Sequence, residues 1–336
     1  MEPKRMIVPA IALLMLATPA THGAAEVTQH TGMCDASAAV PVGTSMFAVA
    51  NDEDNVLRVY QRDASGGPLS SFSLGPFLKI DADGKHPEAD LEGATRIGSR
   101  IYWITSHGAN KEGKPRPNRR RLFATEVRGD GSKIDMIPVG TPYLQLVEDL
   151  AAAQDLKQFR LAAAAANAPE AKDGLNIEGL SRTPQGGLLI AFRNPIPGGK
   201  SLIAPLDNPD EVVNGKPARL GSPILLDLGG LGIRSIEYSE AQRKYFIIAG
   251  SYEDKGDFRL YQWSGLPSAS PTRVSETDFQ GLHPEALIIY PDEKARMQVL
   301  SDDGSELVGG TECKDEKVKA QDKQFRSIWI SPSAGD

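Results

Sequence analysis

Residues 90–108, DLEGATRIGSRIYWITSHG, set a pattern that recurs through this chain. The stretch reads as an apolar strand that opens with a carboxylate, a Gly-containing turn, and a second apolar strand that ends in a polar residue. An antiparallel pair of strands joined by a tight turn brings the start of the first strand beside the end of the second. Glu92 and His107 are therefore expected to lie at one shared edge.

Four further stretches resemble this one. Residues 176–194, NIEGLSRTPQGGLLIAFRN, repeat it closely, and the fifteen residues between Glu92 and His107 also separate Glu178 from Arg193. Three looser copies pair an opening residue with a closing polar residue: Ser37 with Asp52, Glu237 with Ser251, and Glu285 with Asp302. The tetrapeptide HPEA at residues 86–89 recurs at residues 283–286, so Glu88 is an alternative to Glu92, although Glu92-Gly93 matches Glu178-Gly179 better.

The spacing of these copies predicts the fold. Intervals of 55, 86, 59 and 48 residues separate the opening residues Ser37, Glu92, Glu178, Glu237 and Glu285. Most of these lengths are near the size of one propeller blade, and two more strands fit into each interval. We predict an all-β protein, a β-propeller of five blades with four antiparallel strands each. Six blades, a β-sandwich or two stacked barrels are the alternatives.

The longest interval contains a predicted helical insertion at about residues 141–168. Thr141 and Pro142 supply an N-cap and a first helical position, and apolar residues then recur at helical spacing. An alanine-rich run at residues 161–166 continues the segment. We expect it to pack on the rim of the propeller, with a lid over the channel as the alternative.

Residues 1–25 are predicted to be a signal peptide. Lys4 and Arg5 precede an apolar run at residues 7–17, and small residues follow it. An uncleaved anchor is the alternative, but the run is short for a membrane span. We therefore expect one propeller domain at residues 26–336, periplasmic or secreted, with no membrane attachment in the mature form.

Composition and cysteine content narrow the class of protein further. The 33 glycines and 24 prolines suit a turn-rich β protein, and the net charge of −7 argues against nucleic-acid binding. A monomer is expected. In an oxidising compartment Cys34 and Cys313 are predicted to pair and to join the two ends of the fold, with two free thiols as the alternative.

The predicted rim brings carboxylates together. Four glutamates at one end of an axis would repel one another unless positive charge lies among them. A hard cation such as Ca²⁺ accepts carboxylate and amide oxygens, so the predicted metal ligands are Glu92, Glu178, Glu237, Glu285, Asp52 and Asp302, with Asn176 and Asn194 as further oxygen donors. The alternative is a structural ring of ion pairs with Arg193, Arg234 and Arg96.

Other residues supply candidate catalytic and substrate-binding groups. His107 and His283 are candidate general acids or bases, with a structural role as the alternative for each. Residues 109–121, ANKEGKPRPNRRR, contain Arg116 and Arg119, which are candidates to bind an anionic substrate together with Arg193 and Arg234. A solvated loop is the alternative for this basic stretch. The chain has no G-x-S-x-G elbow, P-loop or dinucleotide fingerprint.

Several blocks of the sequence also indicate a family. NDEDNVLRVY, DLEGATRIGSRIYWITSHG, RPNRRRLFAT, NIEGLSRTPQGGLLIAFRNP, GIRSIEY and HPEAL resemble a bacterial family known as domain of unknown function 3616, over nearly the whole mature chain. The chain is more distantly similar to the phytase-like esterase families of the β-propeller group. That resemblance implies a propeller and, in some branches, Ca²⁺-dependent phosphoester or lactone hydrolysis, although a full phytase motif is absent.

Two functional hypotheses follow. The first is an exported hydrolase that binds a divalent cation at the glutamate rim and acts on a small anionic phosphoester, ester or lactone. The second is a non-catalytic propeller whose polar rim binds a ligand or a protein partner and whose glutamates are structural.

Overall fold

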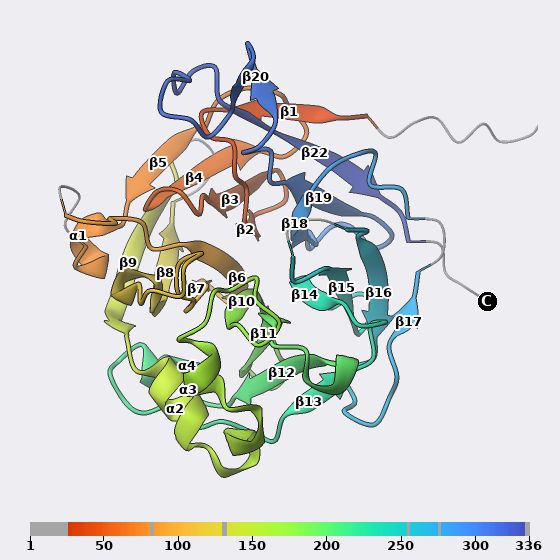
Figure 1. Cartoon of the computed structure of the whole chain (residues 1–336). Coiled ribbons are helices and arrows are strands. Elements are labelled where there is room, and N and C mark those ends of the chain that lie inside the picture. Colours follow the sequence, from red (N-terminus) through yellow and green to blue (C-terminus); the bar gives the residue numbers. More distant parts are fainter. Residues whose placement is uncertain (1–25, 81–83, 130–132, 254–255, 275–276, 333–336) are drawn as a thin grey trace, which may run out of the picture.

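The computed structural model describes residues 26–80, 84–129, 133–253, 256–274 and 277–332. The predicted signal peptide at residues 1–25 lies outside the described residues. Five four-stranded antiparallel sheets stand around a common axis (Figure 1). The prediction of an all-β, five-bladed propeller is confirmed, and the six-bladed, sandwich and stacked-barrel alternatives are wrong.

Each blade runs from an innermost strand at the axis to an outer strand at the periphery. The innermost strands are β2 (Ala38–Val42), β6 (Leu91–Ile97), β10 (Asn176–Arg182), β14 (Gly232–Ser239) and β18 (Pro284–Ile288). The second strands are β3 (Met46–Ala50), β7 (Arg100–Thr105), β11 (Leu188–Asn194), β15 (Lys244–Gly250) and β19 (Met297–Ser301). The third strands are β4 (Val56–Gln61), β8 (Leu122–Arg128), β12 (Ser201–Leu206), β16 (Arg259–Trp263) and β22 (Gln324–Ile330). The outermost strands are β5 (Ser70–Ser73), β9 (Asp135–Tyr143), β13 (Ile224–Leu226), β17 (Thr272–Arg273) and β1 (Thr28–Thr31).

The last blade closes the ring with strands from both ends of the described chain. Its order is β1-β22-β19-β18, so the first strand of the chain forms the outer edge of the final blade. Antiparallel pairing sets Thr28 opposite Ser327 and His30 opposite Phe325. The His30 ring is buried and stacks on Phe325 at 4.8 Å between ring centroids. The sequence analysis did not predict this closure, because β1 precedes the first recognisable repeat.

The hydrophobic core lies between blades. Five clusters of buried apolar side chains each join two neighbouring sheets. Trp103, for example, belongs to the cluster shared by the first two blades, and Trp263 to the cluster shared by the third and fourth. The apolar contacts that stabilise the fold are therefore distributed around the ring, and polar side chains line the axis.

The helical insertion begins later than predicted. Strand β9 continues through Tyr143, which pairs with Leu122, and helix α2 (Leu146–Ala152) starts after it. The prediction of an N-cap at Thr141 and a first helical position at Pro142 is wrong. Proline is tolerated in the outermost strand of a sheet, where its missing N–H costs no ladder hydrogen bond.

The insertion packs against the blades. Helix α2 is followed by the 3₁₀ helix η2 (Gln154–Phe159) and by α3 (Leu161–Ala164). Leu146, Leu150 and Leu161 enter the core cluster between the second and third blades. The short elements elsewhere are α1 (Gly75–Leu78), η1 (Pro117–Arg119), η3 (Pro197–Gly199), α4 (Pro209–Val212) and the hairpin strands β20 (Leu307–Val308) and β21 (Thr311–Glu312).

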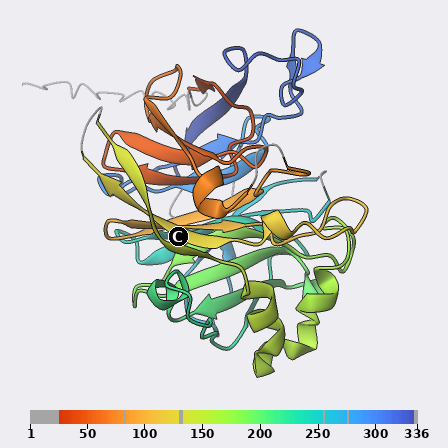
Figure 2. The same ribbon diagram turned by 90° about the vertical axis from the view of Figure 1, so that its left-hand side faces the viewer.

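The two ends of the axis differ. All innermost strands start at one end, which we call the acidic face after Asp35, Asp52, Asp90, Glu92 and Asp302. The long connections at residues 106–121 and 302–323 leave the sheets at this end (Figure 2). At the opposite end, which we call the turn face, short turns join each innermost strand to the second strand of its blade.

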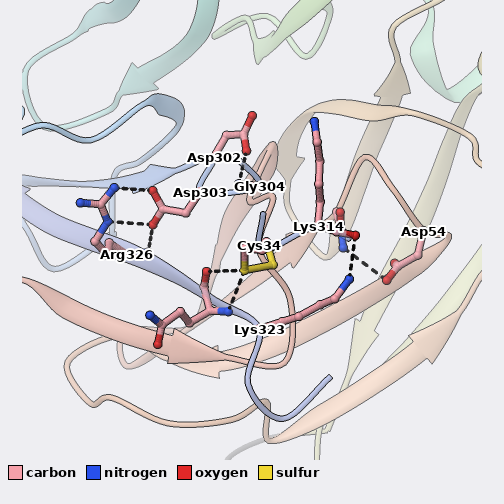
Figure 3. Close-up of a disulfide and its surroundings, with 11 residues drawn as sticks. Cys34, Asp54, Asp302, Asp303, Gly304, Lys314, Lys323 and Arg326 are labelled. Atoms are coloured by element: carbon pink, nitrogen blue, oxygen red, sulfur yellow. Dashed lines mark hydrogen bonds and ion pairs between the residues drawn. A yellow bond between two sulfur atoms is a disulfide. The ribbon is translucent and has the colours of Figure 1, made fainter. Parts of the chain in front are cut away.

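Cys34 and Cys313 form a disulfide, as predicted. Their Cα atoms are 5.9 Å apart, and 279 positions separate them in sequence. Cys34 directly precedes the first blade, and Cys313 follows the β20–β21 hairpin. Figure 3 shows this bond beside Arg326, whose guanidinium contacts Asp303 through two hydrogen bonds. The described residues include no helix that is long and apolar enough to cross a membrane.

Removing the disulfide should destabilise the closure of the ring. We expect the Cys34→Ala/Cys313→Ala variant to lose about 2–5 kcal/mol in free energy of unfolding, because the long loop that it encloses is no longer restricted in the unfolded chain. Urea unfolding with and without dithiothreitol measures the effect. The reductant should destabilise the wild type and leave the variant unchanged; an equal response of the two proteins would contradict this account.

Candidate functional site

A bulged residue lies near the start of four innermost strands. The register of the inner pair shifts at Glu92, Glu178, Arg234 and Glu285 in the second to fifth blades. A β-bulge inserts one unpaired residue and re-aims its side chain. In the first blade Ser37 takes the corresponding place and donates a hydrogen bond from Oγ to the carbonyl of Leu91 at 2.6 Å. We call these five residues the bulge ring.

The bulge ring shows that one of the residues predicted to open a repeat, Glu237, was wrongly chosen. In the fourth blade Arg234 occupies the position of the other glutamates, so the prediction that Glu237 shares their rim is wrong. Measured from Arg234, the intervals to Glu178 and Glu285 become 56 and 51 residues, which are more regular than those predicted. Glu237 lies three residues further along β14, about 10 Å nearer the turn face. The bulge at Glu92 also shows that Glu92, and not Glu88, marks the second blade.

The Glu-Gly pairs of the second and third blades have a steric cause. A Cβ atom at Gly93 would lie 2.9 Å from Ile104 Cγ2 and 3.1 Å from Leu180 Cβ. At Gly179 it would lie 2.7 Å from Ala191 Cβ. Adjacent blades converge at the axis, and only glycine leaves room beside each bulged glutamate.

Two of the three bulge-ring glutamates are held by arginine. Arg234 Nε lies 3.1 Å from Glu178 Oε2 and 3.0 Å from Glu285 Oε2. Arg193 Nη1 lies 2.9 Å from Glu178 Oε1, which also accepts a hydrogen bond from Asn176 Nδ2 at 2.8 Å. All four charged side chains are buried. This chain of ion pairs is the structural alternative predicted for Glu178, Glu285, Arg193 and Arg234.

Glu92 forms no such pair within the described part of the chain. Burial raises the pKa of Glu92 well above its usual value, and the carboxylates of Glu178, Asp90 and Asp52 raise it further, with Arg234 opposing them. Burial likewise raises the pKa of Asp52, as do Asp35 and Asp302. Asp52 Oδ1 is buried and has no hydrogen-bond partner among the described residues. The acidic face therefore holds more carboxyl groups than its arginines pair with.

Asp35 and Asp302 bring a second pair of carboxyl groups together. An isolated antiparallel bridge joins their backbones. Burial, the charge of Asp302 and a hydrogen bond with Asp302 raise the pKa of Asp35 to about 9. A Cβ atom at residue 304 would lie 1.7 Å from Asp35 Oδ1, so Gly304 is required beside this carboxyl. Asp35 is therefore protonated near neutral pH.

The basic stretch after β7 is largely engaged by neighbouring groups. Arg119 lies 3.1 Å from Glu88 and 3.0 Å from Asp90, and Arg120 lies 3.3 Å from Glu148 of the helical insertion. Arg116 Nη1 donates a long hydrogen bond of 3.4 Å to the carbonyl of Pro115. Arg119 is thus brought into the acidic face, whereas no contact joins Arg116 to it within the described residues.

The two predicted catalytic histidines differ in their surroundings. His107 is fully buried, and its Nδ1 lies 2.8 Å from the carbonyl of Thr105, so Nδ1 is the protonated nitrogen. Burial lowers the pKa of His107 to about 4, and Arg120 and Arg121 act in the same direction. His283 is exposed on the acidic face, where its Nδ1 lies 3.3 Å from the carbonyl of Asp302. Only His283 combines access to solvent with a position beside the carboxylates.

The fit to a divalent cation is partial. The acidic face supplies carboxylate and amide oxygens, which hard cations prefer, and Asp52 Oδ1 and Asn176 Oδ1 are buried without hydrogen-bond partners among the described residues. In that same part of the chain, no three His, Cys, Asp or Glu side chains stand at metal-ligand spacing. Coordination would thus require carboxylate side chains to turn toward one another.

Sequence reasoning missed Asp35, Asp90 and Lys314. Asp90 stands two residues before Glu92, as Asn176 stands two before Glu178, so the repeat itself carried a signal for Asp90. Asp35 follows Cys34 and Lys314 follows Cys313 in the sequence. The predicted disulfide could therefore have indicated that Asp35 and Lys314 lie close together. Burial alone would lower the pKa of Lys314, but the carboxylates of Glu53, Asp35, Asp302 and Asp52 outweigh it and raise this pKa.

Glu237 lies between the two ends of the axis. A narrow cavity of about 10 Å³, lined by Glu92, Glu178 and Glu237, leaves room in the channel for about one water molecule. Burial raises the pKa of Glu237 to about 8, while Arg182 opposes this shift. The carboxyl group is therefore mostly neutral at pH 7.

Comparisons with known proteins identify a matching family and several solved structures that align with this chain. The family described as "Protein of unknown function (DUF3616)" matches residues 137–300, from the end of the second blade into the fifth, which confirms the resemblance noted in the sequence. No curated protein matches the chain significantly.

Solved structures that align with the chain are distant. They include glutaminyl cyclase from Myxococcus xanthus, with 12% identity, coverage of 91% of this chain and 95% of that chain, and a TM-score of 0.43. PQQ-bound aldose sugar dehydrogenase from Streptomyces coelicolor has 10% identity, 91% and 99% coverage, and a TM-score of 0.40. Exo-β-1,3-galactanase from Phanerochaete chrysosporium has 9% identity, 90% and 64% coverage, and a TM-score of 0.46. Such values say nothing about the activity of this chain.

Stability should fall with rising pH through the titration of Glu237. Its pKa is about 4.3 in the unfolded chain and about 8 in the folded protein, so the folded state binds more protons between these values. The free energy of unfolding then decreases by up to about 1.4 kcal/mol per pH unit in that window. Glu237→Gln cannot ionise and should lack this contribution.

Urea unfolding of both proteins at pH 5 and pH 8 measures the difference. The variant should gain stability relative to the wild type as the pH rises. Glu316→Gln, at an exposed residue of the long connection before β22, serves as the control. A difference between wild type and Glu237→Gln that is the same at both pH values would show that Glu237 is ionised throughout.

Proposed function

We propose that this chain, which belongs to the DUF3616 family of proteins of unknown function, is an exported hydrolase whose acidic face binds a divalent cation, with Ca²⁺ as the preferred ion. The observation that supports this most is the cluster of carboxyl groups at Glu92 and Asp52, whose pKa values are raised by burial and raised further by neighbouring carboxylates. A nearby positive charge favours the ionised form of such groups. A bound cation would supply that charge.

Glu92 and Asp52 are the first ligands in this proposal. Neither forms an ion pair with an arginine among the described residues, and both lie within the electrostatic influence of other carboxylates. Asp302 would join them from the last blade. Glu178 and Glu285 already bind Arg234, so the cation would compete with this arginine for their oxygens. The predicted ligand Glu237 is left out because it lies further along the channel.

The hydrolytic part of the proposal uses neighbouring proton donors and acceptors. A divalent cation polarises a phosphoryl or carbonyl oxygen. Asp35, which is protonated near neutral pH, would donate a proton to a leaving group, and the exposed His283 would accept one from water. Arg119 and Arg193 would orient an anionic substrate. The substrate class is a small phosphoester, ester or lactone.

Export is proposed on two features. The signal-peptide pattern at residues 1–25 predicts translocation, and the Cys34–Cys313 bond is of the kind that forms in oxidising compartments. We place the mature protein, as a monomer, in the periplasm or outside the cell.

A second candidate function is a non-catalytic propeller that binds a ligand or a protein partner. The chain of ion pairs from Arg193 through Glu178 and Arg234 to Glu285 favours it, because these groups neutralise one another without a cation. In this case the acidic face would be a recognition surface.

Thermal melting in the presence of cations separates the two candidates. CaCl₂, MgCl₂, MnCl₂ and EDTA are each added to the purified protein. We expect Ca²⁺ to raise the Tm, because a ligand of the native state stabilises by about 2.7 kcal/mol at a hundred times its Kd. Glu92→Gln and Asp52→Asn should weaken the response. Glu237→Gln, at a carboxyl away from the acidic face, should keep it.

An unchanged Tm in all three salts would contradict cation binding and favour the second candidate function. If Ca²⁺ stabilises the protein, hydrolysis of p-nitrophenyl phosphate, p-nitrophenyl acetate and a γ-lactone is assayed next. Turnover that Asp35→Asn abolishes while the Tm response to Ca²⁺ persists would support the proposed acid. Ca²⁺ binding without any turnover would indicate a binding protein.

A further inference from the structure

A second opening lies on the turn face, at the end of the axis away from the acidic residues. It is a cavity of about 490 Å³, a volume typical of small-molecule pockets. Its charged and aromatic lining residues are Arg96, Arg182, Glu237, Tyr238, Glu240, Tyr290 and Glu293. These residues come from the ends of the innermost strands and from the turns that follow them. The narrow channel separates this pocket from the acidic face.

Arg96 has a charge that no carboxylate neutralises in the described part of the chain. Its Nε donates to the carbonyl of Gly98 at 2.8 Å, and its Nη1 donates to the carbonyl of Pro41 at 3.2 Å. These two contacts use two of the five N–H groups of a guanidinium and fix its plane. The side chain is partly withdrawn from water, and this burial lowers the pKa of Arg96 without removing its proton at neutral pH.

The other charged groups of the pocket balance one another. Arg182 Nη2 lies 2.6 Å from Glu240 Oε2, and its guanidinium stacks over the ring of Tyr238 at 4.9 Å. Glu293 lies 2.6 Å from Arg296, and Arg62 pairs more closely with Asp63 at 2.8 Å and Asp292 at 3.0 Å. Glu237 is mostly neutral near pH 7 because burial raises its pKa to about 8. The positive charge of Arg96 therefore remains unpaired among the described residues of the pocket.

We propose that the turn-face pocket binds a small organic monocarboxylate, whose carboxylate pairs with the free N–H groups of Arg96 and whose apolar body lies against Ile289, Pro291 and Tyr290. A guanidinium with a fixed plane and free N–H groups matches the two oxygens of a carboxylate. The single unpaired cation suits a monoanion, because a second negative charge would find no other unpaired cation in the described pocket. Neither proposed function of the acidic face requires this site.

The neutral Glu237 fits this ligand in two ways. Its carboxyl group adds no negative charge to repel an anion, and as an acid it can donate a hydrogen bond. Its side chain also stands where the pocket meets the narrow channel, since it lines both cavities. A ligand on the turn face is therefore stopped at Glu237 and does not reach the bulge ring.

Binding of simple carboxylates to the whole protein tests the proposal. Saturation-transfer NMR with benzoate, phenylacetate and hexanoate is compared with the neutral amides benzamide, phenylacetamide and hexanamide. We expect carboxylates to bind and the amides to bind at least about tenfold more weakly, as the loss of a charge-assisted pair predicts. Arg96→Gln should weaken carboxylate binding about tenfold. Arg128→Gln, which changes an exposed arginine of the same blade outside the pocket, should not.

A blocking variant covers the case in which Arg96→Gln is unstable. Ala241 is exposed in the turn after β14 and lines the pocket, so Ala241→Trp should fill it without changing any charge. Loss of carboxylate binding in Ala241→Trp, with an unchanged Tm, would support the proposed site. The proposal is overturned if none of the three carboxylates binds the wild type, or if binding survives both Arg96→Gln and Ala241→Trp.

Discussion

The guanidinium of Arg234, held between Glu178 and Glu285, is the contact on which the centre of this propeller depends. It joins the bulged residues of three neighbouring blades at the point where the innermost strands converge (Figure 1). A buried charge without a partner is strongly unfavourable, so each of these groups requires the others. The apolar clusters between blades stabilise the ring, and this ion-pair chain determines which carboxylates remain available on the acidic face.

The two ends of the axis therefore differ in the charged groups that remain without an ion-pair partner. On the acidic face, Glu92, Asp52 and Asp35 lie among other acids, and their raised pKa values reflect burial together with mutual repulsion. On the turn face, Arg96 has no counter-ion among the described residues. One end of the propeller is thus suited to a cation and the other to an anion, and Glu237 stands between them.

Much of the fold could be predicted from the sequence because each blade repeats the same order of apolar strand residues and turn residues. The room for two more strands in each interval was predicted, and strands such as β4 and β12 occupy it. The fourth blade was misaligned because its bulged residue is Arg234 and not a glutamate, so a search for glutamates selected Glu237, three residues further along the strand. Edge strand β1 was missed because it precedes the first recognisable repeat, and residues 141–143 were missed because Thr141-Pro142 also fits the start of a helix.

The candidate site was less predictable than the fold, since its chemistry depends on contacts between blades. Glu178 and Glu285 look alike in the repeat, yet only the folded ring shows that both bind Arg234. The most direct test is a double-mutant cycle of Glu285→Gln and Arg234→Met, read as free energies of unfolding in urea. A coupling energy of at least about 2 kcal/mol is predicted, because Arg234→Met alone leaves the buried Glu285 without its cation, whereas the double change removes both charges of the pair. Additive effects, with a coupling near zero, would contradict the central role of this ion pair.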